Sequence, residues 1–222
     1  MASDSQLPLS DEGPAAGPVD RKTRAAQRRD TREALIRCGT VMCTERGFQL
    51  TGIDEVLKRV GVPKGSFYHF FASKHEFGLA VIDNYARYFQ RKLDRLLGDS
   101  ARPPLQRLAD FIEEAKHGMA RFDFQRGCLV GNLGQELGAL NENFRQQLED
   151  VLLSWQARTA ECLRAAMAWG ELPGHLDPDR LAAFFWIGWE GAILRAKLSR
   201  STEPMQVFAD MFFTTLGRKT DV

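Results

Sequence analysis

Apolar residues recur at helical spacing along most of this chain, and glycine or proline interrupts the pattern at intervals. From about Asp30 to Gly47 they return every three or four residues, which indicates an amphipathic helix. The segment IDEVLKRV at 53–60 has one apolar face and stops at Gly61. Pro63 then begins a short third helix, PKGSFYHFF, because proline lacks only an N–H that would be unpaired at a first helical position.

Six further helices follow residue 73. Ser73 and Glu76 have the spacing of a capping box, which opens a long helix from 74 to about 97. Asp177 before Pro178 is a typical helix start. The expected ranges are 105–121, 128–137, 142–169, 178–199 and 204–216. Because no segment reads as a strand, we predict an all-α fold of about nine helices.

Charge is distributed unevenly, although the formal net charge is only +1. Residues 21–76 carry twelve lysines and arginines against six acidic residues, whereas 77–222 carry 18 against 19. The first twenty residues are rich in Pro, Gly, Ser and Asp and cannot offset the entropy of ordering. We predict a disordered tail over 1–24, a basic N-terminal domain over 25–76 and a helical body over 77–222. The basic domain suits a polyanion.

Several classes of protein are disfavoured. There is no run of 18 apolar residues and no secretion signal, so we expect a cytoplasmic protein with no membrane partner. Its four cysteines are scattered and form no close pair of the kind found in zinc sites. We expect reduced thiols, no metal and no cofactor.

The second and third helices have the layout of a helix-turn-helix, with the turn supplied by residues 61–63. In such a motif the second helix enters the major groove of DNA. Phe67, Phe70 and Phe71 are interpreted as packing residues. The basic residues of 21–29 can form an arm along the DNA backbone or a solvated run. The predicted DNA-contacting residues are Thr51, Gly52, Lys64, Gly65, Ser66, Tyr68, His69 and Lys74.

The last two helices are unusually rich in large apolar side chains. One monomer can scarcely cover all these faces, and Gly188, Gly191 and Ala192 would allow close helix approach. We therefore predict a homodimer interface made by 178–199 and 204–216. A monomeric core is the alternative.

Cys128 lies at the start of a predicted helix, with Arg121 and Arg126 nearby. A helix N-terminus and cations lower the pKa of a thiol, so we predict a reactive cysteine. The other three cysteines are interpreted as buried apolar residues. A ligand pocket is predicted from two tryptophans, a carboxylate, two amides and a cation, with interface packing as an equally open role. These residues are Trp186, Trp189, Glu190, Asn132, Gln135 and Arg126, with Arg195 and Lys197 as alternative cations.

Residues 30–82, with the segment TGIDEVLKRVGVPKGSFYHFFASKHEFGLAVI, strongly resemble the DNA-binding segment of TetR-family regulators. The resemblance implies a homodimer that binds a palindromic operator in double-stranded DNA and a repressor that a small molecule releases. RGCLVGNLGQELGAL and FWIGWEGAILRAKLSRS are similar to the body of the AcuR and NemR branch, which responds to acrylate and related electrophiles. That similarity implies a sensing role for Cys128. Covalent reaction and a non-covalent anion pocket both remain open.

Two other functions compete with a repressor. An enzyme could use Cys128 as a nucleophile, but His117 and His175 form no recognisable Cys–His arrangement with it. A dimeric helical adaptor would have no need of Lys64, Tyr68 and Lys74, which are all present. We therefore expect a ligand-responsive repressor that is not an enzyme.

Overall fold

The structure is a computed structural model in which residues 21–217 are described. Within that range the chain forms eight α-helices and one 3₁₀ helix, with no strand. The helices are α1 (Arg21–Arg46), α2 (Ile53–Val60), η1 (Lys64–His69), α3 (Lys74–Leu97), α4 (Pro104–Arg121), α5 (Leu129–Leu137), α6 (Glu142–Trp169), α7 (Pro178–Ser199) and α8 (Glu203–Thr215). The predicted all-α fold is confirmed.

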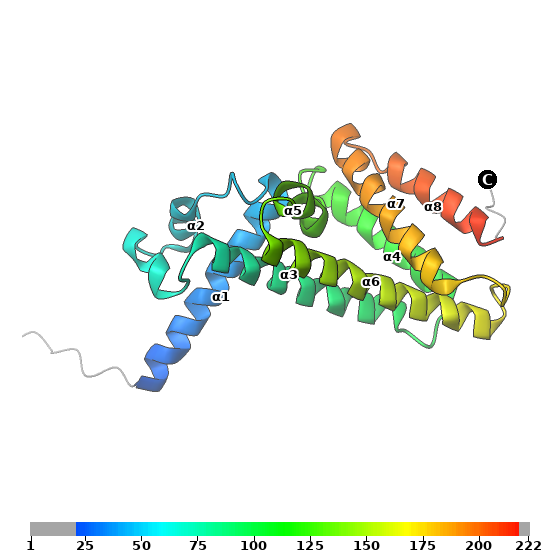
Figure 1. Ribbon diagram of the computed structural model, residues 1–222, viewed down its shortest axis with the longest axis horizontal. Helices are drawn as coiled ribbons and strands as arrows, with labels where there is room; N and C mark the ends of the chain where they lie inside the picture. Colours follow the sequence, from blue (N-terminus) through cyan, green and yellow to red (C-terminus); the bar gives the residue numbers. More distant parts are fainter. Residues whose placement is uncertain (1–20, 218–222) are drawn as a thin grey trace, which may run out of the picture.

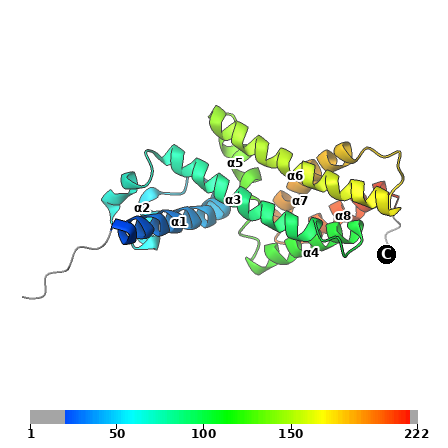
Figure 2. The ribbon, with the colours of Figure 1, turned by 90° about the horizontal axis from the view of Figure 1, so that it is seen from below.

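The molecule is elongated, with a small head and a larger helical body (Figure 1). α1, α2 and η1 make the head, and α3 runs from the head into the body (Figure 2). In the body α6 packs against α3, α4 and α7, and α8 lies against α7 on the outer side. The body and the head therefore share one continuous helix, α3.

Helix ends follow the local sequence. The Ser73 hydroxyl accepts from the N–H of Glu76 at 3.1 Å, and the Glu76 carboxylate accepts from the N–H of Ala72 at 2.6 Å, which completes a variant of the predicted capping box. Asp177 accepts from two N–H groups of the first turn of α7, with Pro178 at the first position. Gly61 ends α2 in the left-handed conformation.

Two predicted elements need correction. α1 begins at Arg21 and not near Asp30, so 21–24, predicted as tail, form its first turn, and the basic residues of 21–29 belong to a helix. The predicted tail over 1–20 lies outside the described residues. The third helix is 3₁₀, with the N–H of Ser66 donating to Pro63 and that of Phe70 donating to Phe67.

Aromatic side chains make much of the core in both parts. In the head, Phe67 and Phe71 are 1% exposed and pack on Phe77 of α3 with ring centroids 5.7 and 5.0 Å away, as expected of packing residues. In the body, Trp155 is fully buried, and the rings of Phe89 and Trp186 lie 4.3 and 4.9 Å from it. This aromatic wall borders the cavity described below.

Candidate functional sites

The exposed surface of η1 and its entry contains most of the predicted DNA-contacting residues. Tyr68 is 72% exposed, and Gly65 and His69 are also exposed. Lys64 is exposed and its ammonium pairs with Asp54 at 2.9 Å. Ser66 is half-buried, and its hydroxyl donates to the Pro63 carbonyl at 2.6 Å. These residues are at least partly exposed to solvent. Their role in DNA binding stays a prediction.

Thr51 needs correction as a phosphate contact. It is 1% exposed, and its hydroxyl donates to the carbonyl of Gly47 at 2.7 Å, so the side chain faces inward. The residue that precedes α2 is Gly52, whose exposed backbone carries no side-chain cap. Lys74 is half-buried: its ammonium donates to the Gln49 carbonyl at 3.3 Å and lies 4.8 Å from the Phe48 ring centroid. A guanidinium of Arg28 in α1 donates to the carbonyl of His69 and fastens η1 to α1.

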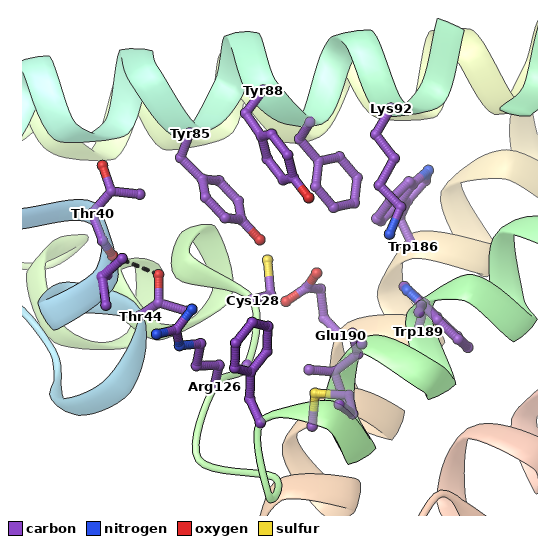
Figure 3. A pocket seen from close by; sticks show the side chains of 18 residues that line it. Thr40, Thr44, Tyr85, Tyr88, Lys92, Arg126, Cys128, Trp186, Trp189 and Glu190 are labelled. Carbon is purple, nitrogen blue, oxygen red and sulfur yellow. Dashed lines mark hydrogen bonds between the residues drawn. The ribbon is translucent and has the colours of Figure 1, made fainter. Parts of the chain in front are cut away.

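A cavity of about 310 Å³ opens inside the body between α1, α3, α4, α7 and the start of α5. Its aromatic walls include Trp186, Trp189 and Phe89, and Tyr88 and Phe122 lie among its more exposed lining residues. Figure 3 shows Tyr85 and Lys92 reaching in from α3, with Cys128 and Glu190 opposite them. A small molecule with an apolar part and one polar group fits such a site.

Trp186, Trp189, Glu190, Arg126 and Cys128 all line this cavity, as the pocket prediction required. The indole N–H of Trp186 donates to the Thr159 hydroxyl at 2.9 Å, so this ring offers the cavity only its apolar surface. Tyr85 and Lys92 also line this cavity, although they were not among the residues predicted from the sequence. Their signal was present in the helical spacing of 85, 88, 89 and 92, which places four large side chains on one face of α3.

Cys128 is the N-cap of α5, and its sulfur accepts from the N–H of Gly131 at 3.5 Å. Burial and then the neighbouring Glu190 carboxylate nevertheless raise the pKa of Cys128 well above its usual range. The predicted lowering of the thiol pKa is therefore wrong for this structure. Arg126 does not reverse it, because its guanidinium pairs with Glu45 at 2.9 Å.

Glu190 is the unusual charged group of the cavity. Burial raises the pKa of its carboxyl to about 7, although hydrogen bonding to the Cys128 thiol acts in the opposite direction. Its Oε1 atom is buried without a hydrogen-bond partner in the described chain. A Cβ at Gly131 would overlap its Oε2 atom, so a side chain at this position would displace the end of the Glu190 side chain. Burial, followed by Cys128 and Glu190, raises the pKa of Tyr85 as well.

A second cavity, of about 600 Å³, lies on the other side of Cys128 and Glu190, which line both cavities. Asn132 and Gln135 line this outer cavity and not the inner one, so the predicted pocket divides in two. Of the alternative cations, Lys197 also lines the outer cavity, while Arg195 lies in a groove beside α8. Burial lowers the pKa of Lys197.

Comparison with known proteins gives two family matches that together span most of the chain. Residues 39–81 match the family described as bacterial regulatory proteins, tetR family, and 104–212 match the tetracyclin repressor-like C-terminal domain. The transcriptional regulator AcuR of Cereibacter sphaeroides is 50% identical over 209 residues, covering 93% of this chain and 95% of AcuR. The chain belongs to the TetR family.

Other TetR-family relatives agree in sequence and in structure. The repressor NemR of Escherichia coli is 34% identical over 178 residues, covering 80% of this chain and 89% of NemR. A crystal structure of a TetR regulatory protein from Rhodobacter sphaeroides has a TM-score of 0.79 at 53% identity, covering 82% of this chain and 96% of that one. Reduced NemR has a TM-score of 0.76 at 29% identity, covering 84% and 97%.

Membership of the TetR family makes this protein a ligand-responsive transcriptional regulator that binds DNA, and not an enzyme. The nucleophilic-enzyme and adaptor alternatives are thereby removed. No helix within residues 21–217 has the length and apolar character needed to cross a membrane.

In this TetR-family regulator the helices around the cavities also form hydrogen bonds with the backbone at the end of α1. The Glu136 carboxylate of α5 accepts from the N–H groups of Phe48 and Gln49 at 2.8 and 2.5 Å. The Asn132 amide donates to the Thr44 carbonyl at 3.1 Å, and the Lys197 ammonium donates to the Glu45 carbonyl at 3.4 Å. We call the contacts of Asn132 and Glu136 with 44–49 the α5 clamp, because they connect the cavity wall with the head.

Proposed function

We propose that this protein is a homodimeric repressor that binds a palindromic operator through the face of α2 and η1, and that acrylate or a related activated alkene releases it by adding to Cys128. The observation that carries the proposal is the position of Cys128. Its thiol lines the inner cavity and also caps α5, the helix that holds the end of α1. The similarity to AcuR and NemR supports the same assignment.

A ligand event at Cys128 has a short path to the head. A group added to the sulfur crowds the start of α5, where the sulfur accepts from the N–H of Gly131, and so favours a shift of the first turn of α5. α5 carries Asn132 and Glu136, which hold 44–49 just before α2 begins at Ile53. Movement of this segment changes the spacing of the two recognition elements, which must match half-sites about 34 to 36 Å apart.

The proposal is tested with Cys128→Ser and a matched control, Cys162→Ser. Cys162 is also buried in the body, but its thiol donates to the Pro104 carbonyl at 3.3 Å and does not line the inner cavity. Operator release is followed by fluorescence anisotropy during titration with acrylate, and adducts are located by intact-mass and peptide mass spectrometry.

We expect wild type and Cys162→Ser to gain one adduct at Cys128 and to leave the operator. Cys128→Ser should bind the operator with nearly unchanged affinity and stay bound. Release of Cys128→Ser at wild-type acrylate concentrations would contradict a covalent sensor. Release of wild type without any adduct would instead assign the cavity to a non-covalent anion.

A further inference from the structure

The carboxyl of Glu190 is buried beside the thiol of Cys128, and no cation among the described residues pairs with it. It extends from α7 into the space that the missing side chain of Gly131 leaves, and its Oε1 is unpaired in the described chain. Figure 3 shows the carboxyl directed toward the sulfur of Cys128. Burying an unpaired carboxyl is costly, and an apolar residue would be cheaper if packing were its only role. Its presence indicates a use in the chemistry of the thiol.

The charged groups around Glu190 do not neutralise it. From α3, Lys92 enters the same cavity but pairs with Glu114 at 3.3 Å, and Tyr85 contributes a neutral hydroxyl. The guanidinium of Arg126 pairs with Glu45. Lys197, on the same helix as Glu190, points its ammonium at the carbonyl of Glu45 on α1. Among these neighbouring groups, the Cys128 thiol is the one that hydrogen-bonds to the Glu190 carboxyl.

We propose that Glu190 accepts the thiol proton when Cys128 attacks an activated alkene, and then returns it to the product; this rests on the covalent function proposed above. The proton moves from sulfur to the Glu190 carboxylate as the sulfur lone pair bonds to the β-carbon. The alkene electrons move onto the conjugated carboxylate or carbonyl. Glu190 then protonates the α-carbon, which leaves a thioether and a free carboxylate, with no oxidant or reductant involved.

The neighbouring groups fit this sequence. The N–H of Gly131, directed at the sulfur, stabilises the charge that develops there. With a pKa of about 7, Glu190 is present in both forms at neutral pH, as a general base requires. Because the resting thiol keeps its proton, an electrophile reacts only after it has entered the cavity beside Glu190. The ligand class that follows is a small alkene conjugated to a carboxylate or carbonyl.

Glu190→Gln tests this role because two explanations of the carboxyl predict opposite results. If Glu190 only disfavours the thiolate by its charge, its removal lowers the thiol pKa and accelerates addition. If it accepts the proton, its removal slows addition by about 100-fold, the lower end of general-base effects. The probe is acrylate, and the rate of adduct formation at Cys128 is measured by intact mass between pH 6 and 9.5.

In wild type we expect the rate to rise with pH and to level above the Glu190 pKa. In Glu190→Gln it should rise about tenfold per pH unit to higher pH, because thiolate must then form without help. Glu190→Asp should keep the wild-type shape of profile at a reduced rate. Glu136→Gln, which removes a carboxylate that α5 contributes to the outer cavity, should react at the wild-type rate. Thermal unfolding and operator affinity verify that each variant is folded.

An unchanged or faster rate in folded Glu190→Gln would overturn the proton-acceptor role and leave the sensor function standing. Absence of any Cys128 adduct in wild type at every pH would overturn the covalent function together with this role.

Discussion

Glu190 and Thr51 show how burial decides what a polar side chain can do. The carboxyl of Glu190 has a raised pKa because protein atoms replace water around it. The hydroxyl of Thr51 is also enclosed, but a carbonyl accepts its hydrogen bond, so it serves the turn after α1. Their residue types alone suggested a ligand contact and a phosphate contact. Only the surroundings distinguish a group held for chemistry from one held for structure.

The raised pKa of Glu190 predicts a pH-dependent stability. The folded carboxyl has a pKa of about 7 against an ordinary value of 4.5, so the folded state binds the extra proton between these values. Stability therefore falls as pH rises through this window, and the loss is complete above pH 7. Glu190→Gln should be more stable than wild type at pH 8 by up to about 3 kcal/mol. Below pH 4.5 the difference should vanish.

Urea unfolding at pH 4.5, 6 and 8 measures this difference. Glu142→Gln is the control, because that carboxylate is exposed at the start of α6 and pairs with Arg145. A constant difference between wild type and Glu190→Gln at all three pH values would show that the pKa of Glu190 is the same in the folded and the unfolded protein.

At this same scale the sequence located Cys128 but misjudged its ionisation. A helix N-terminus and nearby arginines are visible in the sequence, whereas the burial that dominates the thiol pKa depends on how α5, α3 and α7 pack. Arg126 could not be assigned either, because its partner Glu45 lies 81 positions away in the chain. Local patterns identify the group, and long-range packing sets its charge.

At the scale of elements, α5 combines two functions in nine residues. Its N-cap, Cys128, lines both cavities, while Glu136 near its end accepts two N–H bonds from the segment after α1. A carboxylate that accepts two backbone donors makes charge-assisted bonds, which are among the stronger contacts available on a protein surface. This places the α5 clamp between ligand and head.

Glu136→Gln should uncouple these two ends of α5. The amide has one acceptor oxygen and no charge, so one of the two N–H groups of 48–49 loses its partner. We expect acrylate to modify Cys128 at the wild-type rate, while the fraction of operator released at full modification falls. Anisotropy and mass spectrometry on the same samples measure both quantities. Full release by the modified variant would show that the α5 clamp does not transmit the modification of Cys128 to the head.

The pattern of apolar residues predicted most helices closely because each has a buried face. α2, α3, α6 and α7 have the predicted bounds. α1 was predicted too short because its first ten residues are mainly polar and give no periodic signal. η1 was predicted as a short helix of unspecified type, and Gly65 and Ser66 favour the tighter 3₁₀ turn that the Arg28 contact with His69 holds in place.

At the scale of the whole molecule, α7 and α8 expose a broad apolar surface on the outer side of the body. Ile187 and Leu198 are 74% and 71% exposed, and Val207 and Met211 are 55% and 61% exposed. Such a surface on one side of a soluble protein marks an interface. The predicted dimer through these two helices would bury it and would close the outer cavity, which Ile187 and Leu194 also line.

Ile187→Asp should therefore weaken the dimer and lower operator affinity, because a carboxylate would be buried at the interface. Leu153→Asp in α6 is the matched control, since Leu153 is 49% exposed but lies on another helix. Sedimentation equilibrium measures the monomer fraction, and anisotropy measures affinity. Equal dimerisation of the two variants would show that Ile187 of α7 does not lie in the dimer interface.

The Asp54 carboxylate, which pairs with Lys64, would compete with a DNA phosphate for the Lys64 ammonium. Before Lys64 can contact a DNA backbone, its ammonium must leave a carboxylate on the preceding helix. Water screens an exposed pair of this kind, so a well-placed phosphate displaces it easily. In DNA of arbitrary sequence the phosphates are less well placed, so replacing the Asp54 carboxylate by a phosphate gains less free energy. If Lys64 contacts phosphate as predicted, an acidic residue inside a basic surface would help the head to discriminate between an operator and DNA of other sequence.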